Sequence, residues 1–254
     1  MIGLIIIGIG IIIGIAIYAD RKRRIHGYKL PSNTKQLLSE NVSFYNNLES
    51  KDKALFEARI KDFLANISIR GIGVEVEDLD RILIASGAIM LIFSFPDWKY
   101  NNISEVLLYK NTFNKEYSTV GTDRNVLGMV GDGAMHREMI LSQQSLRASF
   151  RTNTDGQNTV IHEFAHLIDK ADGATDGMPE YLLSHANLLP WAKLVHETIK
   201  EMKQKGHSDI NPYGTTDDAE FFAVISEYFF ESSEKLKEHH PELYDMLEKM
   251  FHPA

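Results

Sequence analysis

Two histidines and a glutamate stand in this sequence at a spacing that suits metal chemistry, in the segment His162-Glu163-Phe164-Ala165-His166. Residues four apart lie on one face of an α-helix, one turn apart. The side chains of His162 and His166 can therefore reach the same metal ion. Glu163 lies beside the first histidine, where its carboxylate can accept a proton from water, and zinc lowers the pKa of a bound water to about 7. The motif predicts zinc-dependent peptide hydrolysis.

The alternative interpretation of this motif is a pair of surface histidines on an amphipathic helix. The window from 159 to 168 is strongly apolar and lacks proline, which favours a helix packed within the protein. A catalytic zinc site also needs a third protein ligand. Asp172 or Asp176 could supply it from nearby, or a glutamate could supply it from a later helix. The metzincin class is excluded, because it requires glycine at position 169 and histidine at position 172, and both positions are aspartate here.

Two glutamates of the apolar segment AEFFAVISEYFF are candidates for that later helix. Glu220 and Glu227 are seven residues apart, which is two helical turns, so they share a face. A carboxylate on such an apolar helix needs a partner, and a zinc ion is one.

Carboxylates can also orient the histidines from behind, because metal-bound histidines usually donate their second N–H to one. Asp169 or Glu227 could serve in this way, and the alternative is a solvated or helix-capping carboxylate. The remaining histidines considered have no ligand spacing, and we interpret them as surface residues: His136, His185, His196, His207, His239, His240 and His252.

The elements that must position these residues are mostly helical. Apolar periodicity predicts helices in LLSENVSFYNNL, in KDKALFEARIKDFL with Ser50 as N-cap, and over about 158–170, 189–205, 217–231 and 234–250. The apolar stretch 82–95 is too short for a membrane span and predicts a buried helix. Short strands are expected over 104–109 and 138–142, with turns in the glycine-containing stretch 121–133. The predicted fold class is α+β, mostly helical with a small sheet, and an exposed strand edge near the metal helix could pair with an extended peptide.

Composition narrows the function further. The net charge of −8 argues against direct nucleic-acid binding. The sequence has no cysteine, which excludes disulfides, a thiolate metal site and a cysteine nucleophile. A transition metal would therefore be held by imidazole and carboxylate groups.

The N-terminal segment 2–18 is uncharged and apolar on every side, and the basic cluster 21–24 follows it. About 18 helical residues span roughly 27 Å, close to the thickness of a bilayer core. A buried core helix is the alternative. The positive-inside rule predicts a single-pass protein of the inner (cytoplasmic) membrane with its catalytic domain in the cytoplasm. We thus expect a transmembrane anchor over 2–19, a linker over 20–33 and a metallopeptidase domain over 34–254.

Longer stretches around the motif resemble a known family. The run NTVIHEFAHLIDKADGATDG, followed by NPYGTTDDAEFFAVISEYFF, is similar to the Mlc titration factor A family of bacterial zinc peptidases, whose catalytic core is related to anthrax lethal factor. SFYNNL, the stretch 82–95 and FPDWKYNNISEVLLY extend the likeness, which covers roughly residues 35–250. The apolar N-terminal segment is not part of the family core.

The resemblance implies a zincin-like domain and a role for each matching residue. His162 and His166 match the two histidine ligands, Glu163 the general base and Glu220 the third ligand, which makes the site gluzincin-like. Tyr213, seven residues before Glu220, matches a tyrosine that stabilises the oxyanion. A phenol O–H suits that task, because it can donate to the charge that develops on the carbonyl oxygen.

Three functions are compatible with these residues. The first is a zinc metallopeptidase, either an aminopeptidase or an endopeptidase, acting on a peptide or protein substrate. The second is a regulatory binding protein that captures a transcriptional repressor, with hydrolysis secondary, since the family's namesake activity is binding such a regulator. The third is a zinc hydrolase of another bond. Replacing Glu163 by glutamine would separate the first two, because only cleavage requires a general base.

Overall fold

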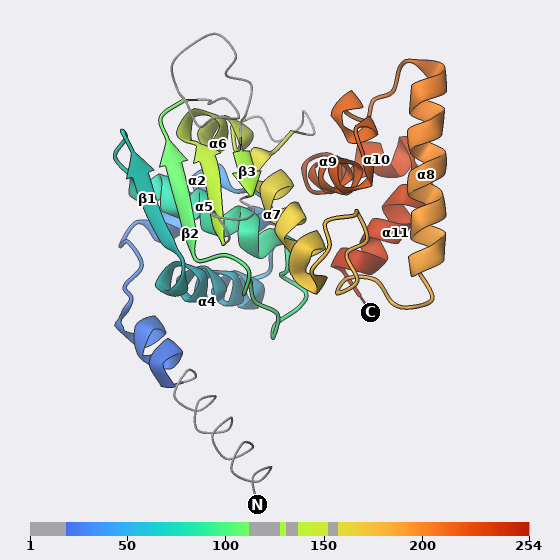
Figure 1. Cartoon of the computed structure of the whole chain (residues 1–254). Helices are drawn as coiled ribbons and strands as arrows, with labels where there is room; N and C mark the ends of the chain where they lie inside the picture. Colours follow the sequence, from blue (N-terminus) through green and yellow to red (C-terminus); the bar gives the residue numbers. More distant parts are fainter. Residues whose placement is uncertain (1–18, 112–127, 131–136, 152–156, 254) are drawn as a thin grey trace, which may run out of the picture.

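The computed structural model describes residues 19–111, 128–130, 137–151 and 157–253 (Figure 1). Helices make up most of this part of the chain. The part before residue 150 contains α2 (Thr34–Asn41), α3 (Ser43–Asn47), α4 (Ser50–Asn66), α5 (Asp78–Leu91) and α6 (Gln143–Ser149). The C-terminal half contains α7 (Thr159–Asp169), α8 (Leu188–Lys205), α9 (Asp218–Glu231), α10 (Ser233–His239) and α11 (Pro241–Phe251), with short 3-10 turns η2 (Lys170–Asp172) and η3 (Pro212–Thr215). Residues 19–27 are helical, and all but the first lie in the stretch 20–33 expected to be a linker.

A four-stranded mixed sheet lies beside these helices. Its strands are β1 (Ser68–Ile72), β2 (Glu105–Tyr109), β3 (Gly128–Val130) and β4 (Glu138–Ser142), in the order β1-β2-β4-β3. β1, β2 and β4 run parallel, and β3 pairs antiparallel with β4. β3 forms one edge of the sheet, and α7 packs against this edge. The expected α+β class with mostly helical content and a small sheet is confirmed.

The core is built around two apolar helices. Residues 82–91 of α5 are all buried, and α5 packs against α4 and α7. Asp80 is also fully buried in the first turn of α5, where Arg147 and Gln143 donate hydrogen bonds to its carboxylate. In α9, all residues from Ala219 to Phe229 except Glu220 are buried. This helix packs along α7. In Figure 1, α7 therefore lies between the sheet with its helices and the C-terminal helices.

Several predicted elements agree with the structure, and some boundaries differ. The strands expected over 104–109 and 138–142 are β2 and β4. The single helix expected over 234–250 is two helices, α10 and α11, because Pro241 lacks an N–H to continue α10 and suits the first turn of a new helix. Ser50 begins α4, and Glu49 is the N-cap residue. Most of the stretch 121–133 lies outside the described residues, although 128–130 form β3.

The expected membrane location needs correction. A transmembrane helix requires about 20 predominantly apolar residues. No helix among the described residues combines that length with sufficient apolar character. α8 has 18 residues but carries several lysines, and α5 is apolar but has only 14 residues. Of the segment 2–19 expected to form the anchor, residues 2–18 lie outside the described part of the chain. A single-pass inner-membrane protein with the membrane as a partner is therefore not supported.

Candidate metal centre

The helix α7 presents the two motif histidines on one face. Its N-cap is Asn158, whose side-chain oxygen accepts the backbone N–H groups of Val160 and Ile161. This cap satisfies two of the N–H groups that an isolated helix start leaves without partners. His162 and His166 follow one turn apart, and their Nε2 atoms are 3.2 Å from each other.

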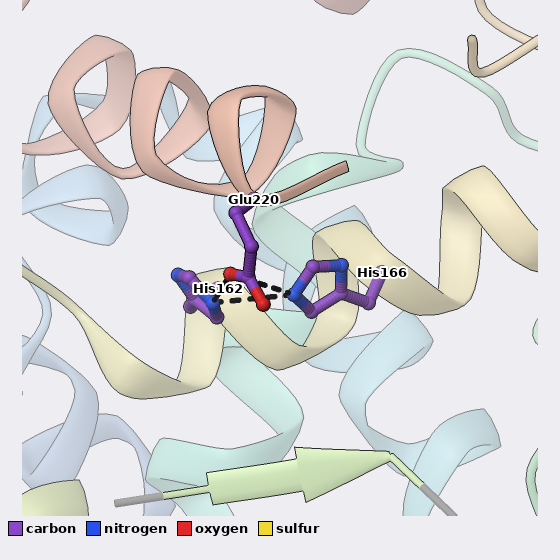
Figure 2. A group of neighbouring side chains, drawn as sticks. All are labelled: His162, His166 and Glu220. Atoms are coloured by element: carbon purple, nitrogen blue, oxygen red, sulfur yellow. Dashed lines mark hydrogen bonds and ion pairs between the residues drawn. The ribbon is translucent and has the colours of Figure 1, made fainter. Parts of the chain in front are cut away.

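The third member of the group comes from α9. Glu220 Oε2 is 3.0 Å from His162 Nε2 and 3.4 Å from His166 Nε2. Figure 2 shows the carboxylate of Glu220 lying against both imidazole rings. Asp217 caps α9 by accepting the backbone N–H of Glu220, which holds the glutamate in the first turn. Within the described residues, these three side chains are the group whose ligand atoms could hold a metal ion.

The spacing and chemistry of these atoms fit a divalent cation. In a tetrahedral site with bonds of about 2.0–2.1 Å, neighbouring ligand atoms lie about 3.3 Å apart. The three separations here are 3.0, 3.2 and 3.4 Å. Burial disfavours a charge on His162, but Glu220 and Glu227 outweigh this and raise its pKa to about 10. Burial raises the pKa of the Glu220 carboxyl, but His162 and His166 outweigh this effect and hold that pKa well below its usual range. The site thus favours a positive charge between these groups, which a metal ion can supply.

Glu227 contacts His162 from the side opposite Glu220. Its Oε1 atom is 2.7 Å from His162 Nδ1, and its Oε2 atom accepts the backbone N–H of Asn158 at 2.5 Å. A carboxylate partner at Nδ1 orients the ring and directs Nε2 to the metal position. Of the two carboxylates expected to serve in this way, Glu227 is therefore the one that contacts a motif histidine.

Asp169 is buried, and its contact is with the loop after α7. Its Oδ2 atom accepts the backbone N–H of Gly177, and burial raises the pKa of its carboxyl to about 6. Within the described residues, Nδ1 of His166 has no hydrogen-bond partner.

The two nearby aspartates considered as ligands lie outside the group of His162, His166 and Glu220. Each contacts its own loop instead: Asp172 accepts the N–H of Ala174, and Asp176 accepts that of Met178.

Glu163 lies beside the group and points toward the sheet. It is 5% exposed, and burial raises its pKa to about 7 although the neighbouring histidines oppose the shift. Gly128 of β3 lies close to it: a Cβ atom placed on that residue would lie 2.6 Å from both Cγ and Oε1 of Glu163. The edge strand can pass this close only because position 128 has no side chain.

Tyr213 approaches the group from the other side. It lies in η3, where Asn211 caps the turn by accepting the N–H of Tyr213. Its hydroxyl donates to Glu220 Oε1 at 3.2 Å, and the residue is 53% exposed. Burial of the hydroxyl and the charge of Glu220 raise its pKa to about 12. The phenol is therefore a proton-bearing donor at neutral pH, within reach of a molecule bound at the group.

Two residues of this site were not predicted from the sequence. Asn158 precedes an apolar helical run, which is the usual signal for an N-cap, but its link to Glu227 has no sequence signature. Gly128 lies in a stretch expected to form turns, and no spacing relates it to Glu163.

Two histidines one helical turn apart, with a glutamate from a later helix, form the ligand arrangement of metallopeptidases. The chain belongs to the glucose-regulated metallo-peptidase M90 family, whose sequence profile matches residues 17–252. An uncharacterized protein of Synechocystis sp. is 28% identical over 243 residues, which cover 91% of this chain and 87% of that protein. Mlc titration factor A of Pectobacterium atrosepticum is 29% identical over 183 residues, covering 64% of this chain and 66% of that protein. The same-named protein of Salmonella arizonae is 28% identical over 218 residues, covering 78% and 82%. The family resemblance inferred from the sequence is confirmed.

Proposed function

We propose that this chain is a zinc-dependent peptidase with a zincin-like, gluzincin-type site. His162, His166 and Glu220 would hold the ion, and the proposal rests chiefly on their three ligand atoms converging at 3.0–3.4 Å. A set of two imidazole nitrogens and one carboxylate oxygen would suit zinc better than magnesium or calcium, which prefer oxygen alone. The ion would polarise a substrate carbonyl and make water acidic enough to attack it at neutral pH.

The protein's own groups would handle protons and charge around that carbonyl. Glu163 accepts the proton of the attacking water and passes it to the departing amine, which is the general-base and general-acid task of the motif. Tyr213 turns its hydroxyl from Glu220 to the carbonyl oxygen, where the negative charge develops. This movement is feasible because its ring is half exposed. Glu227 keeps His162 oriented throughout.

The sheet edge supports a peptide as the substrate class. β3 ends the sheet, runs antiparallel to β4 and passes against Glu163 through Gly128. An extended peptide could add to such an edge by backbone hydrogen bonds, which would bring one of its peptide groups to Glu163.

A second candidate function follows from the name of two relatives, Mlc titration factor A. If the name describes a binding activity, this chain would capture a transcriptional regulator, with hydrolysis secondary. The set of His162, His166 and Glu220 with the buried Glu163 beside it favours the peptidase. A protein that acts only by binding needs no buried carboxylate next to a metal-binding group.

The test is a comparison of the purified full chain with Glu163→Gln, and with Glu197→Gln of the exposed face of α8 as matched control. Bound zinc is measured by elemental analysis and cleavage with a peptide library. We expect about one zinc per chain in all three proteins and cleavage in all but Glu163→Gln. Zinc without cleavage in the wild type would favour the binding function. A chain that binds no zinc would refute the peptidase proposal.

A further inference from the structure

Asn158 connects the start of α7, which carries His162 and His166, to α9, which carries Glu220. Its side chain is fully buried, and it uses its hydrogen-bonding groups in two directions. Toward α7, Oδ1 accepts two N–H groups of the first turn, and the backbone carbonyl accepts the N–H of His162 at 2.9 Å. Toward α9, the backbone N–H donates to Glu227 Oε2 at 2.5 Å and Nδ2 donates to Glu231 Oε1 at 2.8 Å.

The carboxylate of Glu227 transmits this connection to the metal group. One of its oxygens accepts from Asn158 and the other lies 2.7 Å from His162 Nδ1. A displacement of Glu227 would turn the His162 ring about its Cβ and move Nε2 away from Glu220.

Helix capping alone does not explain why position 158 is asparagine. Aspartate caps a helix as well as asparagine does, and its negative charge suits a helix N-terminus. Asparagine differs from aspartate in its amide nitrogen, which donates to the carboxylate of Glu231. A second carboxylate, that of Glu227, accepts the backbone N–H of the same residue. An aspartate here would place three carboxylates together and would offer no side-chain N–H to any of them.

We propose that Asn158 is a positioning residue of the metal site: by holding Glu227 and Glu231 of α9 against the first turn of α7, it keeps His162 in its ligating orientation. The inference rests on the proposed metal-binding function. It adds that the affinity for the ion depends on a residue one step behind the partner of His162: its backbone N–H binds Glu227, and its side-chain amide holds Glu231, one turn further along α9.

The experiment measures metal affinity of the full chain by chelator competition with Zn²⁺, and the ligand geometry by the visible absorption of bound Co²⁺. Asn158→Asp keeps the cap and removes the N–H donor. We expect it to bind Zn²⁺ about tenfold more weakly, because the backbone N–H still binds Glu227 and the lost bond to Glu231 lies one step further from the metal ligand. Asn66→Asp is the matched control, because Asn66 also donates its amide N–H to a carboxylate, that of Asp62, but on α4. Its affinity should stay within about twofold of the wild type.

Two further variants separate positioning from a loss of folding. Asn158→Asp combined with Glu231→Gln reverses donor and acceptor, and it should restore most of the affinity and the Co²⁺ spectrum. Glu231→Ala leaves the cap intact and should weaken binding by about tenfold. Wild-type affinity in Asn158→Asp would overturn the inference, and so would a loss that the reversed pair does not restore. A wild-type chain that binds neither metal would instead refute the proposed function, and the inference with it.

Discussion

Adding one methyl group to the edge strand tests how closely β3 must approach the proposed general base. In Gly128→Ala the new Cβ would lie 2.6 Å from Cγ and Oε1 of Glu163 and 2.8 Å from its Cδ. Non-bonded heavy atoms prefer about 3.5–4.0 Å. The Glu163 side chain or the strand would therefore have to move by about 1 Å. Because Glu163 is buried, little free space is available for the displaced carboxylate.

A displacement of this size should reduce catalysis and leave the metal in place. A misplacement of about 1 Å near the reacting groups costs about 100-fold in rate. General acid–base catalysis as a whole contributes about 10²- to 10⁴-fold, which sets the upper limit of the effect. The three heavy atoms nearest to the new Cβ all belong to Glu163, so the ligand group should keep its geometry. We expect kcat to fall about 100-fold with unchanged zinc content.

The assay is peptide hydrolysis with parallel elemental analysis, and Gly27→Ala is the control because a Cβ there meets no heavy atom within 4 Å. Combining Gly128→Ala with Glu163→Gln gives a double-mutant cycle. If the alanine acts through Glu163, it should have almost no further effect when Glu163 is already glutamine. Activity of Gly128→Ala within about threefold of the wild type, or fully additive losses in the cycle, would refute the reasoning.

Three other substitutions have defined outcomes. Tyr213→Phe should lower kcat by about 10²- to 10³-fold in the peptide assay with zinc retained, and unchanged kcat would exclude the oxyanion role. Asp169→Asn should stabilise the metal-free chain against urea by on the order of 2 kcal/mol at about pH 8 and by almost nothing below about pH 4. Burial raises the pKa of Asp169 from 3.8 to about 6, so the wild-type folded state loses stability as pH rises from 3.8 to about 6. Asparagine does not titrate, and its side-chain oxygen can still accept the N–H of Gly177. Equal stabilisation at both pH values would contradict that cause. Asp209 accepts from Tyr228 and two histidines of the α10–α11 junction, which keep its pKa below the usual range despite burial. Asp209→Asn should therefore cost about 1–3 kcal/mol in thermal unfolding at neutral pH, and an unchanged melting temperature would contradict it.

Local patterns account for the parts of the fold that could be predicted. The four-residue spacing of His162 and His166 and the apolar periodicity around them identify α7, because helical geometry depends only on neighbouring residues. Apolar runs likewise identified α5, β2 and β4. β1 was not predicted: its sequence SIRGI contains an arginine and a glycine, and it is a strand because β2 pairs with it 37 residues later, with Ser68 opposite Glu105.

Long-range contacts decided the rest of the candidate site. The sequence by itself determined a helix with two histidines one turn apart and a glutamate beside the first. It left Asp172, Asp176 and Glu220 as alternatives for a third ligand until a family resemblance favoured the last. Only the packing of α9 along α7 brings Glu220 to the histidines and Glu227 to His162, because those residues are 58 and 65 positions apart in the chain. The contacts of Asn158 and Gly128 arise in the same way. Side chains this distant in sequence have no periodic relation, so their meeting depends on the tertiary structure alone.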